Sequence, residues 1–303
     1  MVDKVLDEGH IAKSRTGTLK LSALVTAALT YGLVGLGSTV RVTESGMGCP
    51  SWPLCYGQLG PIFQLHPLLE ESHRYLASLV TVAAILTLLL ALRLPSSTAT
   101  KKSAKLAVGL VLFQVLLGGL TVLARNAPWT VALHLITGLV FLAITTATAA
   151  LAFLGDAFTG LSPVSKRWGM FSLLFTLLLL FSGSLVVGSG AGAACPSWPV
   201  CFAGASPRLI AVALFHRIVM GVAGLTIIAF LVKGWNGASK LWKIWARVTI
   251  VMVLVVAGIG AQVALSKSSP LWADIHLGVA AALWVLLVVE VITLKSPEVN
   301  HAP

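Results

Sequence analysis

The stretch Cys49-Pro-Ser-Trp-Pro-Leu-Cys55 occurs twice in this chain, because Cys195-Pro-Ser-Trp-Pro-Val-Cys201 repeats it 146 residues later with one conservative change. The match continues upstream without a gap, and residues 37, 38, 40 and 46 are identical to residues 183, 184, 186 and 192. Two prolines between the cysteines exclude a continuous helix or a central strand. Each copy is therefore expected to be a rigid loop, and the chain a tandem duplication with two related sites.

The composition is that of a membrane protein. Apolar residues make up 57% of the 303 residues and charged residues only 10%, and the mean hydropathy is +0.94. Apolar runs of about 20 residues are long enough to cross a hydrocarbon core of about 30 Å. The expected spans are residues 19–40, 73–94, 105–123, 129–154, 168–187, 209–232, 242–265 and 271–294. Because strand-length segments are missing, these spans are expected to be helices.

The eight spans and the duplication together predict the fold class. We expect an all-α membrane protein of eight transmembrane helices, arranged as two tandem four-helix bundles. Since each half has four spans, the halves share one orientation and are related by a pseudo-twofold axis along the membrane normal. The expected organisation is an N-terminal tail (1–18), a first half (19–155), a linker (156–167), a second half (168–295) and a C-terminal tail (296–303).

The positive charge follows the topology. Of the 21 Lys and Arg residues behind the net charge of +11, 15 lie on one side of the expected spans and six on the other. The positive-inside rule therefore places both termini in the cytoplasm. We expect a multi-pass protein of the plasma membrane. Topology explains the charge, so we do not expect nucleic acid as a partner.

This orientation places both cysteine loops outside the cell, where disulfides persist. All four cysteines lie in these loops, and we expect the disulfides Cys49–Cys55 and Cys195–Cys201. A metal site is the alternative, although neither loop contains a histidine to complete four ligands. A redox role for one pair, by thiol exchange, is a further alternative.

Four histidines lie towards the outer ends of the even-numbered spans, in two matched pairs. His73 and His134 are 61 residues apart, and His216 and His276 are 60 residues apart. Ionisable residues inside a membrane are usually functional. Two imidazoles that face each other across a bundle suit a transition metal or a heme iron, whereas zinc requires further ligands that the second half does not offer. The spacing therefore favours one heme pocket in each half.

Other residues are expected to complete the pockets. Arg74 and Arg217 each follow the first histidine of a pair and are expected to bind heme propionates, because arginine pairs with carboxylates bidentately. The alternative is that these side chains extend to the membrane interface. Glycines at positions 118, 119, 258 and 260 are expected to line the heme slot.

The two halves differ near the first histidine of each pair. Glu70 and Glu71 precede His73, but the corresponding residues of the second half are Ala213 and Leu214. Glu70 and His73 share one face of a helix, so a carboxylate is placed beside the iron ligand. We infer that chemistry takes place in the first half and that the second half holds a fixed cofactor. The alternative is that both glutamates cap the helix at its N-terminus.

These features resemble the heme A synthase family, membrane enzymes of cytochrome oxidase cofactor assembly. The resemblance covers residues 19–294 and rests on the eight spans in two halves and the paired loop cysteines. Its other parts are Glu-x-x-His-Arg at residues 70–74, His134, His216-Arg217 and His276. It implies an oxidoreductase that converts the methyl group of heme O to the formyl group of heme A through hydroxylation with O₂.

The resemblance also implies roles for the residues. His73 and His134 would hold the substrate heme, Glu70 or its neighbour would be the essential acid, and His216 and His276 would hold heme b. Expected partners are heme O, O₂, an unidentified membrane electron donor, the heme O synthase (protoheme farnesyltransferase) and the lipid bilayer. If both first-half histidines bind iron, either one dissociates during turnover or the oxidation proceeds without a free iron position.

Two other functions compete with this interpretation. A two-heme cytochrome b that acts only in electron transfer requires equivalent halves, and the difference between Glu70 and Ala213 counts against it. A heme transporter or chaperone requires labile binding in both halves.

Overall fold

The computed structural model describes residues 2–60, 62–201 and 206–294 and is almost entirely helical in them. Eight helices of this part of the chain are long and apolar enough to cross a membrane. They are α1 (Val2–Val42), α2 (Leu65–Arg93), α3 (Thr98–Leu123), α4 (Pro128–Leu154), α5 (Met170–Gly188), α7 (Pro207–Gly234), α8 (Lys240–Leu265) and α9 (Pro270–Thr293). The shorter elements are η1 (Ser45–Met47), η2 (Gly155–Ala157), η3 (Ser165–Gly169), α6 (Ala191–Ala194) and η4 (Trp235–Gly237). The all-α fold class and the eight spans are confirmed.

Matched local signals start the helices of both halves. The hydroxyl of Ser97 caps α3 by accepting a hydrogen bond from a backbone N–H, and Ser239 caps α8 in the same way. Pro128 and Pro270 occupy the first turns of α4 and α9, where a missing N–H costs nothing. Capping hydroxyls stabilise a helix start by about 1 kcal/mol. The duplication therefore extends to the residues that set the helix boundaries.

Two helices begin earlier than the hydropathy predicts. α2 starts at Leu65, before the apolar run that begins at residue 73. The Leu and Glu residues of this first segment are good helix formers, so the helix continues beyond the hydrocarbon layer. α1 is helical from Val2, although its membrane-capable part begins at Thr16. The expected first tail (1–18) is thus continuous with the first span, and the expected last tail (296–303) lies outside the described residues.

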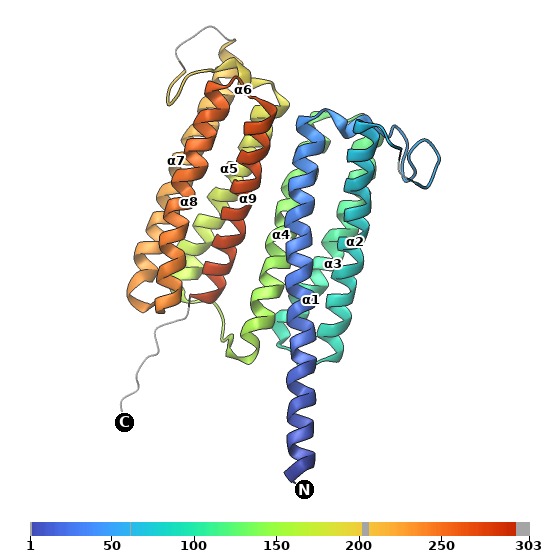
Figure 1. The fold of residues 1–303 in the computed structure, drawn as a ribbon. Helices are drawn as coiled ribbons and strands as arrows, with labels where there is room; N and C mark the ends of the chain where they lie inside the picture. The colour runs from blue at the N-terminus through green and yellow to red at the C-terminus, as the bar shows by residue number, and fades with distance from the viewer. Residues whose placement is uncertain (1, 61, 202–205, 295–303) are drawn as a thin grey trace.

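The helices form two four-helix bundles (Figure 1). In the first bundle each of α1, α2, α3 and α4 packs against its two neighbours in sequence order, and α4 closes the ring on α1. In the second bundle α5, α7, α8 and α9 are packed in the same order. As a consequence α2 and α4 lie on one diagonal of their bundle, and α7 and α9 lie on the corresponding diagonal. This arrangement is compatible with the predicted pseudo-twofold relation between the halves.

The bundles pack side by side through α1 and α4 of the first half and α5 and α9 of the second. The indole N–H of Trp284 donates to the carbonyl of Leu139 across this interface, at 2.9 Å. Leu139 and Leu142 belong to the same apolar cluster as the core of the second half. The face of α4 that meets the second half is therefore part of the core of that half.

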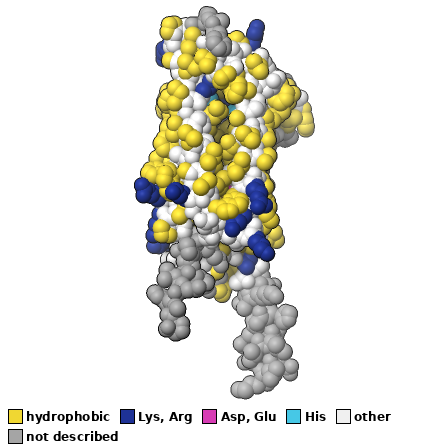
Figure 2. Space-filling view, turned by 90° about the vertical axis from the view of Figure 1, so that its left-hand side faces the viewer, with side chains coloured by type: hydrophobic (Ala, Val, Ile, Leu, Met, Phe, Trp, Pro, Cys, Tyr) yellow, Lys and Arg dark blue, Asp and Glu magenta, His cyan; other side chains and the backbone are white. Residues whose placement is uncertain are grey.

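The surface agrees with a multi-pass membrane protein. Figure 2 shows apolar side chains over the middle of one face, and Lys and Arg side chains gathered mainly towards the end where α1 begins. Many large apolar side chains of the spans are exposed, as lipid-facing residues are; Leu225 and Leu254 are 69% and 67% exposed. Both cysteine loops lie at the opposite end, which we call the loop end (Figure 1).

Candidate heme sites and the cysteine loops

Both expected disulfides are present, between Cys49 and Cys55 and between Cys195 and Cys201. The two loops also share a cis peptide bond before the second proline, at Pro53 in one loop and at the equivalent proline in the other. Among the described residues no cluster of three or more His, Cys, Asp or Glu side chains could hold a metal ion. The pairing of all four cysteines leaves no thiolate for the alternative metal site.

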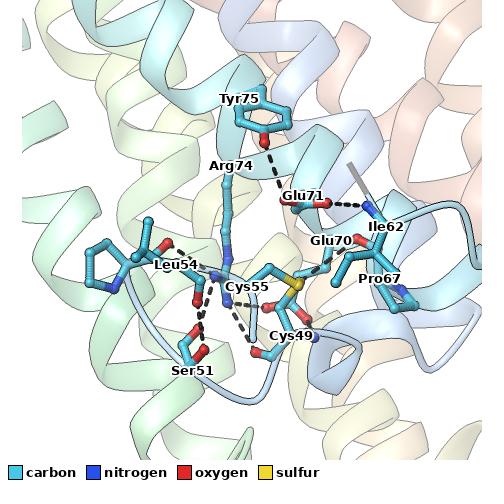
Figure 3. Close-up of a disulfide and its surroundings, with 11 residues drawn as sticks. Cys49, Ser51, Leu54, Cys55, Ile62, Pro67, Glu70, Glu71, Arg74 and Tyr75 are labelled. Atoms are coloured by element: carbon cyan, nitrogen blue, oxygen red, sulfur yellow. Dashed lines mark hydrogen bonds and ion pairs between the residues drawn. A yellow bond between two sulfur atoms is a disulfide. The ribbon is translucent and has the colours of Figure 1, made fainter. Parts of the chain in front are cut away.

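An arginine of the neighbouring helix holds each loop. Arg74 donates hydrogen bonds to the carbonyls of Cys49, Ser51 and Pro53, at 3.1, 3.0 and 3.2 Å (Figure 3). Three carbonyl acceptors on one guanidinium fix the path of the loop across the end of α2. The propionate contact that we expect for Arg74 stays a prediction.

The second loop is held in the same way. Arg217 donates to the carbonyls of Cys195 and Pro199, at 3.2 and 2.9 Å. Since its guanidinium is also placed on loop carbonyls, its expected propionate contact stays a prediction as well. The arginine and its loop are therefore part of the duplicated scaffold.

Glu70 adds a carboxylate to the first loop only. One oxygen accepts the backbone N–H of Cys49 at 2.8 Å and the other accepts from Arg74 at 2.6 Å (Figure 3). Glu70 is only 4% exposed, and its two bonds are of the strong, charge-assisted kind. Ala213 stands at the equivalent position of α7. The first half thus has an acidic group, one helical turn from His73, that the second half lacks.

Glu71 has a different set of contacts. Its carboxylate accepts the backbone N–H of Ile62 at 2.9 Å and the hydroxyl of Tyr75 at 3.1 Å. Figure 3 shows the two carboxylates turned towards different parts of the loop. Neither Glu70 nor Glu71 caps α2, because that helix begins at Leu65. The capping alternative is wrong.

The histidines of each pair come from helices on one diagonal of a bundle. His73 of α2 and His134 of α4 lie close enough to interact electrostatically, and so do His216 of α7 and His276 of α9. Two imidazoles that approach each other across the centre of a helix bundle have the arrangement of axial heme ligands.

A glycine on the adjacent helix faces each of these histidine rings. A methyl group built on the glycine would lie 3.0 Å from the ring at Gly37, 3.3 Å at Gly118, 3.3 Å at Gly183 and 2.9 Å at Gly260. All four values are shorter than ordinary van der Waals contact. The glycines therefore give each ring room to stand against the neighbouring helix, at equivalent positions in both halves.

The glycines that we expect to line the heme slot have different neighbours. Gly118 and Gly260 face histidines, Gly119 makes room for the ring of Trp52, and Gly258 has no described atom within 4 Å of its Cβ position. The slot itself stays a prediction. Gly37 and its partner at residue 183 stand in the duplicated register, but nothing in the sequence connects either of them with a histidine.

The first histidine of each pair differs between the halves at its ring nitrogen Nδ1. Nδ1 of His216 pairs with the hydroxyl of Ser182 at 2.8 Å, which leaves Nε2 for an axial bond. Nδ1 of His73 is buried without a hydrogen-bond partner among the described residues, and Leu36 stands at the position equivalent to Ser182. Nδ1 of the second histidine, His134 or His276, is buried without such a partner in both halves. Paired imidazoles across a bundle suit axial ligation of a heme iron. The residues of both halves therefore fit a heme with two axial histidines.

Two further polar residues confined to the first half do not join the Glu70 cluster. Arg41 of α1 interacts electrostatically with Asp274 of α9, and Thr39 donates to the carboxylate of Asp274 at 2.8 Å. Glu44 is exposed and takes the left-handed turn that Gly190 takes in the second half. Arg41 therefore belongs to the interface between the halves.

Comparison with known proteins identifies relatives over most of the chain. The family described as "Cytochrome oxidase assembly protein" (COX15-CtaA) matches residues 20–71 and 62–288. The chain is 31% identical to the heme A synthase of Geobacillus thermodenitrificans, over 73% of this chain and 72% of that protein. It is 26% identical to the heme A synthase of Bacillus licheniformis, over 82% and 86% of the two chains. It is 28% identical to the heme A synthase of Symbiobacterium thermophilum, over 89% and 93%.

Proposed function

Since the chain belongs to the COX15-CtaA family of cytochrome oxidase assembly proteins, we propose that it acts as a heme A synthase. This oxidoreductase converts heme O to heme A, by oxidising one methyl group of the porphyrin to a formyl group. Two successive hydroxylations of the methyl group give a geminal diol, which loses water to form the aldehyde. Each hydroxylation takes one oxygen atom from O₂ and reduces the other to water, which consumes two electrons and two protons.

We assign the substrate to the first half and a resident heme b to the second. His73 and His134 would hold heme O, and His216 and His276 would hold heme b as the electron-transferring cofactor. The contact between Ser182 and His216 supports this division, because an outer partner fixes the orientation of a ligating imidazole and tightens binding. A resident cofactor benefits from such a bond, whereas a substrate has to leave.

The observation that carries the proposal is the carboxylate of Glu70, which is next to His73 and absent from the second half. The heme iron supplies the oxidising chemistry. The protein positions the methyl group and supplies protons, and Glu70 lies one helical turn before His73 on the same helix face. We propose that this carboxylate, which is paired with Arg74 at rest, takes up and passes on a proton for the reduction of O₂. Glu71 is the alternative, and its bond to the backbone N–H of Ile62 favours a role in holding the loop.

The remaining assignments follow from the charge distribution and the chemistry. Lys and Arg gather at the end opposite the cysteine loops, which supports a plasma-membrane protein with both termini in the cytoplasm. A heme O synthase would supply the substrate, and a membrane electron donor would reduce heme b. The halves at residues 19–155 and 168–295 would be the substrate domain and the heme b domain, joined by the linker at 156–167.

The test is chromatography of the hemes extracted from the purified protein, produced with and without a heme O synthase. Heme A, or a hydroxylated heme O, should appear only when the heme O synthase is present, and heme b should be present in both preparations. Heme b alone in both preparations of well-folded protein would instead support the two-heme electron carrier.

A further inference from the structure

The first bundle contains a small internal cavity on the far side of the histidines from the loop end. Its lining consists of two layers of small residues, each layer with one residue from each of α1 to α4. The layer nearer the histidines is Thr26, Ala84, Ala107 and Thr145, and the farther layer is Ala23, Thr87, Ala104 and Thr148. Each of these residues is at most 4% exposed. The cavity is therefore enclosed by the bundle.

The second bundle fills the equivalent space. Positions equivalent to Ala84 and Thr87 are occupied by Ile227 and Phe230, and the position of Thr145 is occupied by Leu287. Over the eight equivalent positions the first half has 16 non-hydrogen side-chain atoms and the second half has 26. Ile227, Phe230 and Leu287 are all at most 2% exposed. The difference between the halves is thus a difference in the volume of the core.

The organisation of the core shows the same difference. In the second half these three large side chains belong to one apolar cluster, and a separate small cluster lies at the loop end. The first half has two separate clusters, one with Ala23 and Ala104 and one with Ala84 and Ala107. The cavity lies between them. Because close packing is the rule in protein interiors, a core that is split in one half and filled in the other calls for an occupant.

The cavity suits an apolar occupant. The hydroxyl of Thr26 donates to the carbonyl of Ser22 and pairs with the hydroxyl of Thr87, at 2.9 Å each. The hydroxyls of Thr145 and Thr148 donate to carbonyls of their own helix. With every lining hydroxyl engaged, methyl groups are left to face the cavity, and apolar cavities of this kind stay dry.

The distance from the histidines fits a chain attached to the heme. All four residues of the nearer layer lie 11 residues along their helices from a ligating histidine or from the glycine that faces one. At the rise of an α-helix this is about 16 Å, and the farther layer lies about 21 Å away. An extended farnesyl chain on the edge of a porphyrin spans a distance of this order. Between the histidines and the cavity it would pass Val80, Val111 and Phe141.

We propose that this cavity is the subsite for the isoprenoid tail of the substrate heme. The inference rests on the proposed function, because heme O carries a farnesyl group and heme b does not. The cavity, at about 10 Å³, has room for about one water molecule and not for the tail, so the helices part to admit it. Small residues lose few van der Waals contacts in this movement, while the hydroxyl pairs Thr26–Thr87 and Ser103–Thr148 link α1 to α2 and α3 to α4. The filled core of the second half excludes the tail and leaves a site for a heme without one.

The first test uses the wild-type protein. Reconstituted with heme b in the second half, it is titrated with hemes whose tails have no, one, two or three isoprene units, and binding to the first half is followed by absorbance. Affinity should rise with tail length, on the order of tenfold or more per unit, because each unit buries apolar surface. Equal affinity for all the hemes would overturn the proposal while leaving heme A formation, and so the proposed function, intact.

The second test fills the cavity. Ala84→Ile and Thr145→Leu install the residues of the second half, and Ala83→Ile makes the same change one residue away from the lining. The two filling variants should lose the preference for heme O over the tail-free heme by at least about tenfold, and the control should keep it. If the filling variants keep the full preference, the tail lies elsewhere, for example in lipid, and the proposal is wrong.

Discussion

Replacing Glu70 separates its two possible roles, which are to hold a proton and to hold the first cysteine loop. Glu70→Gln keeps an oxygen that accepts the N–H of Cys49, but it removes the charge beside Arg74 and the ionisable group. Glu70→Ala removes both contacts. The structure therefore offers one variant that mainly removes the acid and one that also loosens the loop.

The expected effect on the loop follows from the contacts. In Glu70→Ala the buried N–H of Cys49 loses its acceptor, and Arg74 loses its countercharge but keeps three carbonyl acceptors. Leaving a buried donor unsatisfied and removing a charge-assisted bond costs about 2–4 kcal/mol, or about 30- to 1,000-fold in the local opening of the loop. Glu70→Gln keeps the Cys49 bond, so about 1 kcal/mol, or roughly fivefold, is expected.

The proton role predicts a larger effect on activity than the loop role predicts for Glu70→Gln. A positioned acid or base contributes about 10²- to 10⁴-fold to a rate. If Glu70 holds a proton for the reaction, both variants should lose at least about 100-fold in heme A formation and keep the heme b spectrum. The glutamine variant is the decisive one, because its loop remains nearly as closed as in the wild type.

Two measurements on the same preparations decide between the roles. Heme A formed per heme b gives the activity, and the rate at which a hydrophilic phosphine reduces Cys49–Cys55 gives the opening of the loop. Cys195–Cys201 is the internal control, since Ala213 leaves its loop without a carboxylate. If Glu70→Gln keeps near-wild-type activity while Glu70→Ala loses it, Glu70 is a loop clamp and the proton role is refuted. Loss of heme b in both would indicate misfolding.

Three further predictions concern the histidine environments. Gly260→Ala should lower heme b occupancy by about tenfold or more, because the new methyl group displaces the ring that it faces; Gly258→Ala, with no described atom nearby, should bind heme b normally in a spectral assay. Ser182→Ala removes the bond to His216, so heme b should pass to apomyoglobin about 10- to 100-fold faster, while heme O binding should not change. An unchanged rate of heme b loss would contradict the orienting role. Leu36→Ser places a hydroxyl at the equivalent position of the first half. A hydrogen bond from it to His73 should slow the release of heme A in single-turnover measurements. An unaltered release rate would show that this position does not determine how long the heme stays bound.

The sequence alone predicted the elements whose signals are local. Long apolar runs predicted the eight spans, and the duplicated cysteine motif predicted two equivalent loops, because both depend on residues that are close together in the chain. The start of α2 was missed, because Glu70 and Glu71 lie beyond the apolar run but still within the helix. Hydropathy reports the part of a helix that is in lipid and not the part that rises from it.

The sequence does not show which helices contact each other. The spacing of the histidines predicted the pairs, but the diagonal arrangement of α2 and α4 depends on which helices pack against each other. The position of Arg74 on three loop carbonyls depends on the folded path of residues 49–55, which no periodicity encodes. The cavity is a property of eight side chains from four helices, and it became visible only when the packed halves were compared.

The differences between the halves bear on how O₂ reaches an iron that two histidines ligate. An imidazole whose second nitrogen is hydrogen-bonded is held in one orientation, and His216 has such a bond to Ser182. His73 and His134 have buried second nitrogens without a described partner, as does His276 in the second half, so rotation of either first-half ring away from the iron breaks no hydrogen bond at that atom. Of the two expected routes, dissociation of one axial histidine during turnover is therefore the one that the first half favours. The same feature that opens an iron position would also weaken the hold on the product, as a site that releases heme A requires.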